Sequence, residues 1–440
     1  MRKTIFRKLE AQGTIANYNR FRKNLPSRLP KKVFIWDETL RESEQAPTVF
    51  LTYVEKVKLA KMMDDVGVSI INVGSPGFSE ENKNTIRRIS NESFRNASIA
   101  ASARTTRSDI DACLACGIKE ILISTPFNKL QLEYLMKTSG EAVLQRAFDC
   151  IQYAKSHRLT VDFVLEDASR TPLTEILQIL SIAVEAGADR LVVADTVGFL
   201  RPLSTRYLLS HVRDGLMKSG DRDVPLSIRC SNDFGLATAN TLSAVEEGVA
   251  YPQTSVVGFG ERAGLAAMEE VVTALEILYN IDTDVDVKKL YRLGQLAEKS
   301  FAQPIPFHKP IIGEDVFSHS SDRYVHGMLA HPLIYGPFPA KMIGRESMFY
   351  LGRQTQKELV KDRLTLAEIK ANPRQIDEII RRVRMGQESI DKGELLMTFY
   401  QIKKLQRETR KGLTEEDFWT IVGRITGQKP KAMPDVREQV

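Results

Sequence analysis

The sequence has 440 residues, which is long enough for one large domain with smaller additions. Hydrophobic residues make up 42% of the chain and charged residues 27%, a balance typical of a soluble globular protein. No apolar run approaches the roughly 20 residues that a membrane-spanning helix needs. The 4 cysteines lack disulfide-like spacing, so we expect a cytoplasmic protein in a reducing compartment, with no membrane partner.

Residues 1–32 form a basic arm. Much of the net charge of +6 lies here, because the segment holds many Lys and Arg and one acid, Glu10. Such an arm is compatible with a transit peptide or a nucleic-acid contact. We favour a surface or dimer-contacting extension, and we expect no nucleic acid as a partner.

From about residue 33, short apolar runs alternate with longer amphipathic stretches that end at Gly. The runs are "VFIW" (33–36), "SIINVG" (69–74), "SIAASAR" (98–104), "EILIST" (120–125), "VDFVLED" (161–167), "RLVVAD" (190–195), "LSIRCS" (226–231) and "TSVVGFG" (254–260). Eight strand–helix units in about 250 residues predict an α/β fold, a (β/α)8 TIM barrel over residues 33–300. The alternative is an open doubly wound sheet, but no Gly-rich dinucleotide fingerprint follows the first run.

In a TIM barrel the chemistry lies where strands end and the following loops begin. Polar groups at these positions are Asp37, Arg41, Glu42, Asn72, Arg104, Ser124, Thr125, Glu166, Asp195, Thr196, Arg229, Ser231, Asp233 and Glu261. Their convergence on one mouth favours a small polar substrate. Among them, Arg104 at the third strand end is a substrate-binding candidate.

Beyond the barrel the composition changes. Residues 301–361 are rich in Pro, Gly and His with little periodicity, and predict a small irregular subdomain. Residues 362–440 are strongly charged and helical in pattern, which predicts a solvated helical tail or a dimerisation segment. The pair Cys113 and Cys116 lies inside an amphipathic segment, so we interpret it as two buried thiols.

Several motifs together resemble the DRE-TIM metallolyase superfamily, most closely its isopropylmalate and homocitrate synthase branch. They are "DETLRESEQ" (37–45), "EDASR" (166–170), "ADTVGFLRP" (194–202), "SNDFGLATANTLSAVEEG" (231–248) and "GFGERAGLAAMEEVV" (258–272). Their order and spacing match the family, and the resemblance covers roughly residues 33–355. It implies a homodimer that condenses acetyl-CoA, or another acyl-CoA, with a 2-oxo acid.

The resemblance also implies roles for individual residues. In the family a divalent metal polarises the keto group, an arginine stabilises the alkoxide and a base removes a C–H proton. The catalytic arginine falls on Arg41 and the metal carboxylate on Glu42. The substrate-contacting Gln and Thr fall on Gln45 and Thr196, and the carboxylate of the fifth strand falls on Glu166.

The sequence departs from the family at the metal site. The two metal-binding histidines become Arg229 and Ser231, the Asn of the eighth strand becomes Val257, and the Glu of the second strand becomes Asn72. One remaining carboxylate, Glu42, makes a weak site for a divalent ion, which argues against a retained metal.

Arg229 would project into the position of the metal. A guanidinium is permanently charged and suits a carboxylate through forked donors. We therefore predict that Arg229 pairs with Glu42 at the barrel mouth and, with Ser231 beside it, holds the 2-oxo acid. The alternative, that the pair only fills an inactive site, stays open.

The general base is replaced as well. The family's His-Glu-Ser-Gly-x-His reads "HSSDRY" (319–324), so the catalytic His becomes Tyr324, with His326 two residues further on. Candidates for the base are Glu166, Tyr324 and His326. The Arg with which homocitrate synthases bind a second substrate carboxylate aligns with Asp162, which we expect to repel that group.

The predicted function is therefore an alkylmalate-synthase-like acyltransferase with a remodelled, metal-free site. Two alternatives remain: a non-catalytic paralogue that binds a metabolite or partner, and a retro-aldol or retro-Claisen lyase on the same scaffold.

Overall fold

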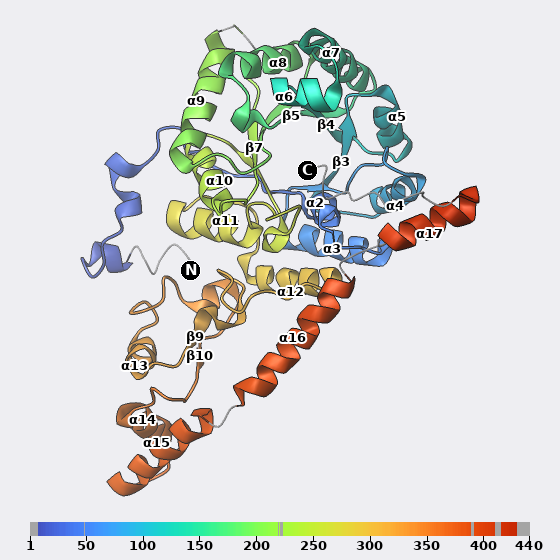
Figure 1. The fold of residues 1–440 in the computed structure, drawn as a ribbon. Helices are drawn as coiled ribbons and strands as arrows, with labels where there is room; N and C mark the ends of the chain where they lie inside the picture. Colours follow the sequence, from blue (N-terminus) through green and yellow to red (C-terminus); the bar gives the residue numbers. More distant parts are fainter. Residues whose placement is uncertain are drawn as a thin grey trace.

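The computed structural model describes residues 8–47, 49–218, 220, 223–388, 391–409 and 415–428. Eight parallel strands close into a barrel in sequence order (Figure 1). They are β1 (Trp36–Asp37), β2 (Ile70–Asn72), β3 (Ser98–Arg104), β4 (Glu120–Pro126), β5 (Thr160–Glu166), β6 (Arg190–Asp195), β7 (Leu226–Cys230) and β8 (Tyr251–Thr254). Because β1 pairs with both β2 and β8, the predicted TIM barrel is confirmed and the open sheet is wrong.

Helices that follow the strands surround the barrel, as Figure 1 shows. They are α2 (Thr39–Glu42), α3 (Tyr53–Val66), α4 (Glu80–Ser90), α5 (Arg107–Ala115), α6 (Lys129–Gln131), α7 (Gly140–Ser156), α8 (Leu173–Ala186), α9 (Pro202–Lys218), α10 (Ala237–Glu246), α11 (Met268–Ala274) and α12 (Leu290–Phe301). Helix α3 begins at a capping box between Thr52 and Glu55 and ends at Gly67, whose φ of 101° suits a glycine. A Cβ at Gly67 would lie 2.3 Å from the carbonyl oxygen of Asp284, so this chain reversal requires glycine.

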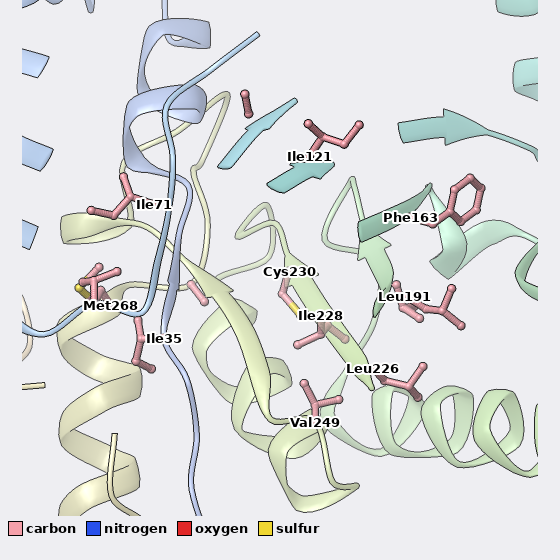
Figure 2. Packing of buried hydrophobic residues seen from close by; sticks show 14 of the residues in the cluster. Ile35, Ile71, Ile121, Phe163, Leu191, Leu226, Ile228, Cys230, Val249 and Met268 are labelled. Atoms are coloured by element: carbon pink, nitrogen blue, oxygen red, sulfur yellow. The ribbon is translucent and has the colours of Figure 1, made fainter. Parts of the chain in front are cut away.

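The main hydrophobic core lies between the outer face of the strands and the helices. Figure 2 shows Ile228 and Cys230 of β7 in this layer, together with residues of neighbouring strands such as Leu191. Side chains alternate along a strand, so Arg229, between Ile228 and Cys230, faces the barrel interior. All four cysteines are free and buried, which confirms the interpretation of Cys113 and Cys116 as buried thiols.

The barrel interior is filled in layers. Its apolar layer consists of Trp36, Ile70, Ala100, Leu122, Val164, Val192 and Ala194. Below this layer, Arg190 forms an ion pair with Asp162 (Nε–Oδ1 2.6 Å) and a second with Glu120. The guanidinium also lies over the Trp36 ring, 5.3 Å from its centroid, so the charge is sandwiched at the amino end of the barrel.

The position of Asp162 corrects one prediction. Asp162 is paired with Arg190 and lies four residues before Glu166, which ends β5 at the mouth. At roughly 3.3 Å per residue, the two carboxylates are about 13 Å apart along the strand. Burial raises the pKa of Asp162 to about 8, although Arg190 opposes the shift. The expectation that Asp162 repels a second substrate carboxylate at the mouth is therefore wrong.

In the described part of the chain after the barrel, a two-stranded parallel pair and five α-helices follow. They are β9 (Ser318–His319), β10 (Met348–Phe349), α13 (Asp322–Ala330), α14 (Lys357–Leu366), α15 (Pro373–Glu388), α16 (Lys392–Thr409) and α17 (Glu415–Thr426). In Figure 1, α13, α14 and α15 lie away from the barrel, below α12. Residues 1–7 of the predicted arm and 429–440 of the predicted helical region lie outside the described residues. Within the described part of the chain, no helix is long and apolar enough to cross a membrane.

Candidate active site

The turn after β1 is fixed by Asp37. Its carboxylate accepts hydrogen bonds from the backbone N–H of Thr39 (2.9 Å) and from the Thr39 hydroxyl (2.6 Å). The same hydroxyl oxygen accepts from the N–H of Val256, which ties this turn to the loop after β8. Burial raises the pKa of Asp37 to about 7, and the hydrogen bonds from Thr39 oppose the shift. Asp37 therefore shapes the mouth rather than facing a substrate.

Four charged side chains meet where β1 and β7 end. Arg41 forms a hydrogen-bonded ion pair with Glu42, and its Nη1 lies 3.8 Å from Oε2 of Glu38. The Nη1 of Arg229 lies 3.8 Å from Oε1 of Glu42, the same oxygen that Arg41 contacts. The predicted pair between Arg229 and Glu42 is therefore confirmed.

Three of these four groups are withdrawn from solvent, and the side chain of Arg41 is 21% exposed. Glu38 is fully buried, while Glu42 is 6% and Arg229 7% exposed. Burial raises the pKa of Glu38, and the guanidiniums of Arg41 and Arg229 oppose that shift without cancelling it. Burial alone lowers the pKa of Arg41, but its three neighbouring carboxylates, Glu42, Glu38 and Glu166, outweigh burial and raise it. Glu166, at the end of β5, is thus one of the carboxylates whose charge acts on Arg41.

Glu38 was not among the predicted site residues. The side-chain amide of Asn72 donates to both of its carboxylate oxygens, at 3.2 and 3.0 Å, and to the hydroxyl of Ser102 at 2.9 Å. The sequence indicates this contact, because Glu38 directly follows Asp37 at the end of the first strand. Asn72 ends the neighbouring second strand, so the two side chains can meet. Strands β1, β2 and β3 are thus linked through one buried amide.

Thr196 and Ser231 close the mouth on the β6 and β7 side. The Ser231 hydroxyl donates to the carbonyl oxygen of Thr196 (2.9 Å), which also accepts from Arg262 (2.7 Å). Arg262 is in turn paired with Asp233 (2.8 Å). The Thr196 hydroxyl accepts from the N–H of Asp167 (2.8 Å). Both predicted residues lie at the mouth, and their hydroxyl groups are engaged in holding neighbouring loops together.

A cavity of about 380 Å³ opens beside the charged cluster, between α2 and the loop after β2. Arg41 and Gln45 line it, together with the apolar side chains of Leu40, Val73 and Ile86. Gln45 thus lies next to Arg41 on the wall of a space that is large enough for a small acid or part of a larger substrate.

Three other predicted residues lie apart from this cluster. Arg104 is bound bidentately by Asp109 (2.8 and 2.9 Å), and its side chain is 70% exposed. On α13, Tyr324 packs against Tyr335 with ring centroids 4.1 Å apart, and His326 lies 3.7 Å from Asp362. Within this single chain, the structure does not bring Arg104, Tyr324 or His326 to Arg41.

Residues 32–297 match the family model described as HMGL-like, and residues 311–390 match the model of the homocitrate synthase post-HMGL domain. The chain belongs to the HMGL-like family. It is 37% identical to a 2-isopropylmalate synthase from Methanocaldococcus jannaschii, over 81% of this chain and 68% of that protein. It is 35% identical to the homocitrate synthase AksA of Methanothermobacter thermautotrophicus, over 88% of this chain and 97% of that protein.

Further relatives agree with this assignment. The (R)-citramalate synthase CimA of Methanocaldococcus jannaschii is 35% identical, over 80% of this chain and 70% of that protein. The hydroxymethylglutaryl-CoA lyase of Pseudomonas aeruginosa has the same barrel, with a TM-score of 0.56 at 21% identity, over 63% of this chain and 96% of that one. The predicted resemblance to isopropylmalate and homocitrate synthases, a group of transferase-type enzymes, is confirmed.

The HMGL-like chain does not offer a divalent metal the donors that its family resemblance implies. Over the residues that the structure describes, no three His, Cys, Asp or Glu side chains are grouped to hold a metal ion. Oε1 of Glu42 faces two guanidiniums, and the hydroxyl of Ser231 is engaged by Thr196. Cys230 faces the helices, on the other side of β7 from Arg229. The residues present do not fit a divalent cation.

Val257 is the residue at which the family resemblance leads us to expect an asparagine. Its φ of 62° and ψ of 1° lie in the left-handed region, where a β-branched residue is rare and Asn is favoured. Its N–H donates to Oε2 of Glu269 on α11 (3.0 Å), which holds the turn in this conformation. The backbone here suits the family's asparagine better than the valine that this chain carries.

Proposed function

We propose that this chain condenses an acyl-CoA, such as acetyl-CoA, with a 2-oxo acid, as an alkylmalate-synthase-like acyltransferase. The observation that carries the proposal is the placement of Arg41, which lies between buried carboxylates and the 380 Å³ cavity at the mouth of an HMGL-like barrel. The relatives of this chain, at 34–38% identity, are named as synthases of this kind.

The reaction requires a proton acceptor and a positive charge. A base removes a proton from the carbon next to the thioester, and the resulting carbanion attacks the keto carbon of the 2-oxo acid. The keto oxygen becomes an alkoxide, which a guanidinium such as that of Arg41 stabilises and which then takes up a proton. Water finally cleaves the thioester, giving the free CoA thiol and a hydroxy diacid.

Glu166 is the candidate base that we favour, because its charge acts on Arg41. The cavity beside Arg41 and Gln45 is the space that we assign to the acyl group and the side chain of the 2-oxo acid. A homodimer is part of the proposal, and sedimentation equilibrium of the full chain tests it.

One observation favours a second candidate, a paralogue that binds a 2-oxo acid without turnover. The carboxylate of Glu42 faces Arg41 and Arg229 instead of a set of metal ligands. The two candidates differ in whether CoA is released.

The test is CoA thiol release from acetyl-CoA, followed with a thiol reagent. Pyruvate, 3-methyl-2-oxobutanoate and 2-oxoglutarate serve as acceptors, the last because Asp162 does not oppose a second carboxylate at the mouth. We expect release that depends on one of these acids and that is lost in Arg41→Gln. Binding of an acid without any release would support the paralogue instead.

A further inference from the structure

We propose that Arg229 is the resident cation of the mouth, and that Arg229 and Arg41 together bind the carboxylate of the 2-oxo acid without a divalent metal. This inference rests on the proposed function and names how its site holds the acid. The two guanidiniums converge on one point, because the Nη1 atoms of both contact Oε1 of Glu42. A carboxylate already bridges them from one side.

The guanidinium of Arg229 has unused hydrogen-bond donors. A guanidinium carries five N–H donors, and a buried charged group without hydrogen bonds is costly. The Arg229 side chain is 8% exposed, and its ion contact with Glu42, at 3.8 Å, is longer than a hydrogen bond. Across the described ranges of the chain, its guanidinium makes no hydrogen bond within 3.5 Å. An anionic ligand would satisfy these donors.

The neighbouring carboxylates are committed elsewhere. Glu42 is hydrogen-bonded to Arg41, and Glu38 receives two hydrogen bonds from Asn72. Arg229 is therefore the guanidinium at the mouth that the internal carboxylates neutralise least. Its two parallel N–H donors match the two oxygens of a carboxylate. An ammonium group is a point charge and does not offer this paired geometry.

A second, independent observation concerns the strand partner of Arg229. Gln253 of β8 is the strand partner of Arg229, and it is fully buried. Among the described residues, both polar atoms of its side-chain amide lack a hydrogen-bond partner, and so does Nε1 of Trp36, the partner of Gln253 on β1. Buried polar groups are almost always satisfied, so the barrel interior at the level of these paired residues has hydrogen-bonding capacity left for a bound water or a polar ligand.

The same arrangement opposes a divalent cation. A metal held by Glu42 would lie near the guanidiniums of both Arg41 and Arg229, and like charges at such distances repel strongly in a buried site. The cation that the family supplies as a metal is thus built into this chain as a side chain.

The experiment measures binding of pyruvate to the full chain by calorimetry, in excess EDTA and in excess MnCl2. We expect the same dissociation constant, within about twofold, in both conditions. Arg229→Gln should weaken pyruvate binding by about tenfold or more, since a charge-assisted bidentate contact is lost. Arg229→Lys, which keeps the charge and loses the fork, should lie between.

The matched control is Arg206→Gln. Arg206 lies on α9 and forms ion pairs with Glu246 and Glu247. Arg206→Gln should leave the affinity for pyruvate unchanged. Circular dichroism of each variant checks that it is folded, and Arg229→Lys keeps the test valid if Arg229→Gln does not fold.

The outcomes separate this inference from the proposed function. Binding that requires Mn²⁺, or that Arg229→Gln and Arg229→Lys leave intact, would overturn the role of Arg229, whatever the turnover. Failure of wild type to bind pyruvate, 3-methyl-2-oxobutanoate or 2-oxoglutarate in either condition would overturn it as well. Metal-free binding that depends on Arg229, without CoA release from acetyl-CoA, would support the inference and contradict the condensation.

Discussion

Asn72 donates from one amide nitrogen to both carboxylate oxygens of Glu38, at 3.2 and 3.0 Å. Glu38 directly follows β1, Asn72 ends the neighbouring strand β2, and both are fully buried. The family resemblance places a glutamate at the second strand end, whereas this chain has its carboxylate at the end of the first. Asn72 is the neutral partner that allows a buried charge at residue 38.

Asn72→Asp should therefore destabilise the protein, because it sets a second carboxylate against Glu38 and removes the donor. Leaving buried charges unpaired in this way costs about 2–4 kcal/mol. Urea unfolding followed by circular dichroism measures the loss. In the double variant Glu38→Gln with Asn72→Asp, the new amide again faces a carboxylate. That variant should recover part of the loss, and simple additivity of the two changes would contradict the contact.

Glu269 makes stability depend on pH. Burial raises its pKa from 4.5 to about 7, and Lys309 opposes the shift. Because the folded pKa lies above the unfolded one, the folded state holds the proton longer, and the stabilising contribution is complete below about pH 4.5. It is lost as the pH rises from there to about 7, by about 3 kcal/mol.

The measurement is the difference in unfolding free energy between wild type and Glu269→Gln across that pH range. Glutamine keeps an acceptor for the N–H of Val257 and cannot ionise. We expect wild type to lose stability relative to Glu269→Gln between about pH 4.5 and 7, with a constant difference above that range. A difference that stays constant throughout would show that Glu269 does not titrate in this window.

Val257→Asn should stabilise the protein. Val257 has a φ of 62°, where β-branched residues are strained and Asn is tolerated. Relief of this strain should raise the free energy of unfolding by about 1 kcal/mol. Loss of the apolar contact that Val257 makes beside Gly294 reduces that gain. Thermal unfolding measures it, and Val256→Asn, at the neighbouring buried position, should instead destabilise. A lower melting temperature for Val257→Asn would mean that packing outweighs the backbone.

Much of this architecture follows from the sequence, and the exceptions have physical reasons. The period of apolar runs predicts the barrel, and strand alternation places Arg229 inside and Cys230 outside. The resemblance assigns Asp162 to the fifth strand but does not say how far along the barrel axis it lies. Asp162 precedes Glu166 by four residues, which places it at the opposite end of the barrel from the mouth. Arg104 forms an ion pair with Asp109 because the end of β3 lies close to the first turn of α5. For Tyr324 and His326, local pattern carries no information on where α13 lies relative to the barrel.

The double variant Arg229→His with Ser231→His tests whether the mouth still has the geometry of a metal site. It would set two imidazoles on the interior face of β7, two residues apart, near the carboxylate of Glu42. Three such donors make a competent site for Mn²⁺ or Zn²⁺. Equilibrium dialysis with metal analysis should therefore find about one ion bound per chain, and Arg229→His alone, with two donors, should bind much more weakly. In the double variant Glu42 would lose its contact with Arg229 and keep its ion pair with Arg41. If the double variant binds no more metal than wild type, the strand end has moved away from the family's geometry, and Arg229 is not a replacement in the same place.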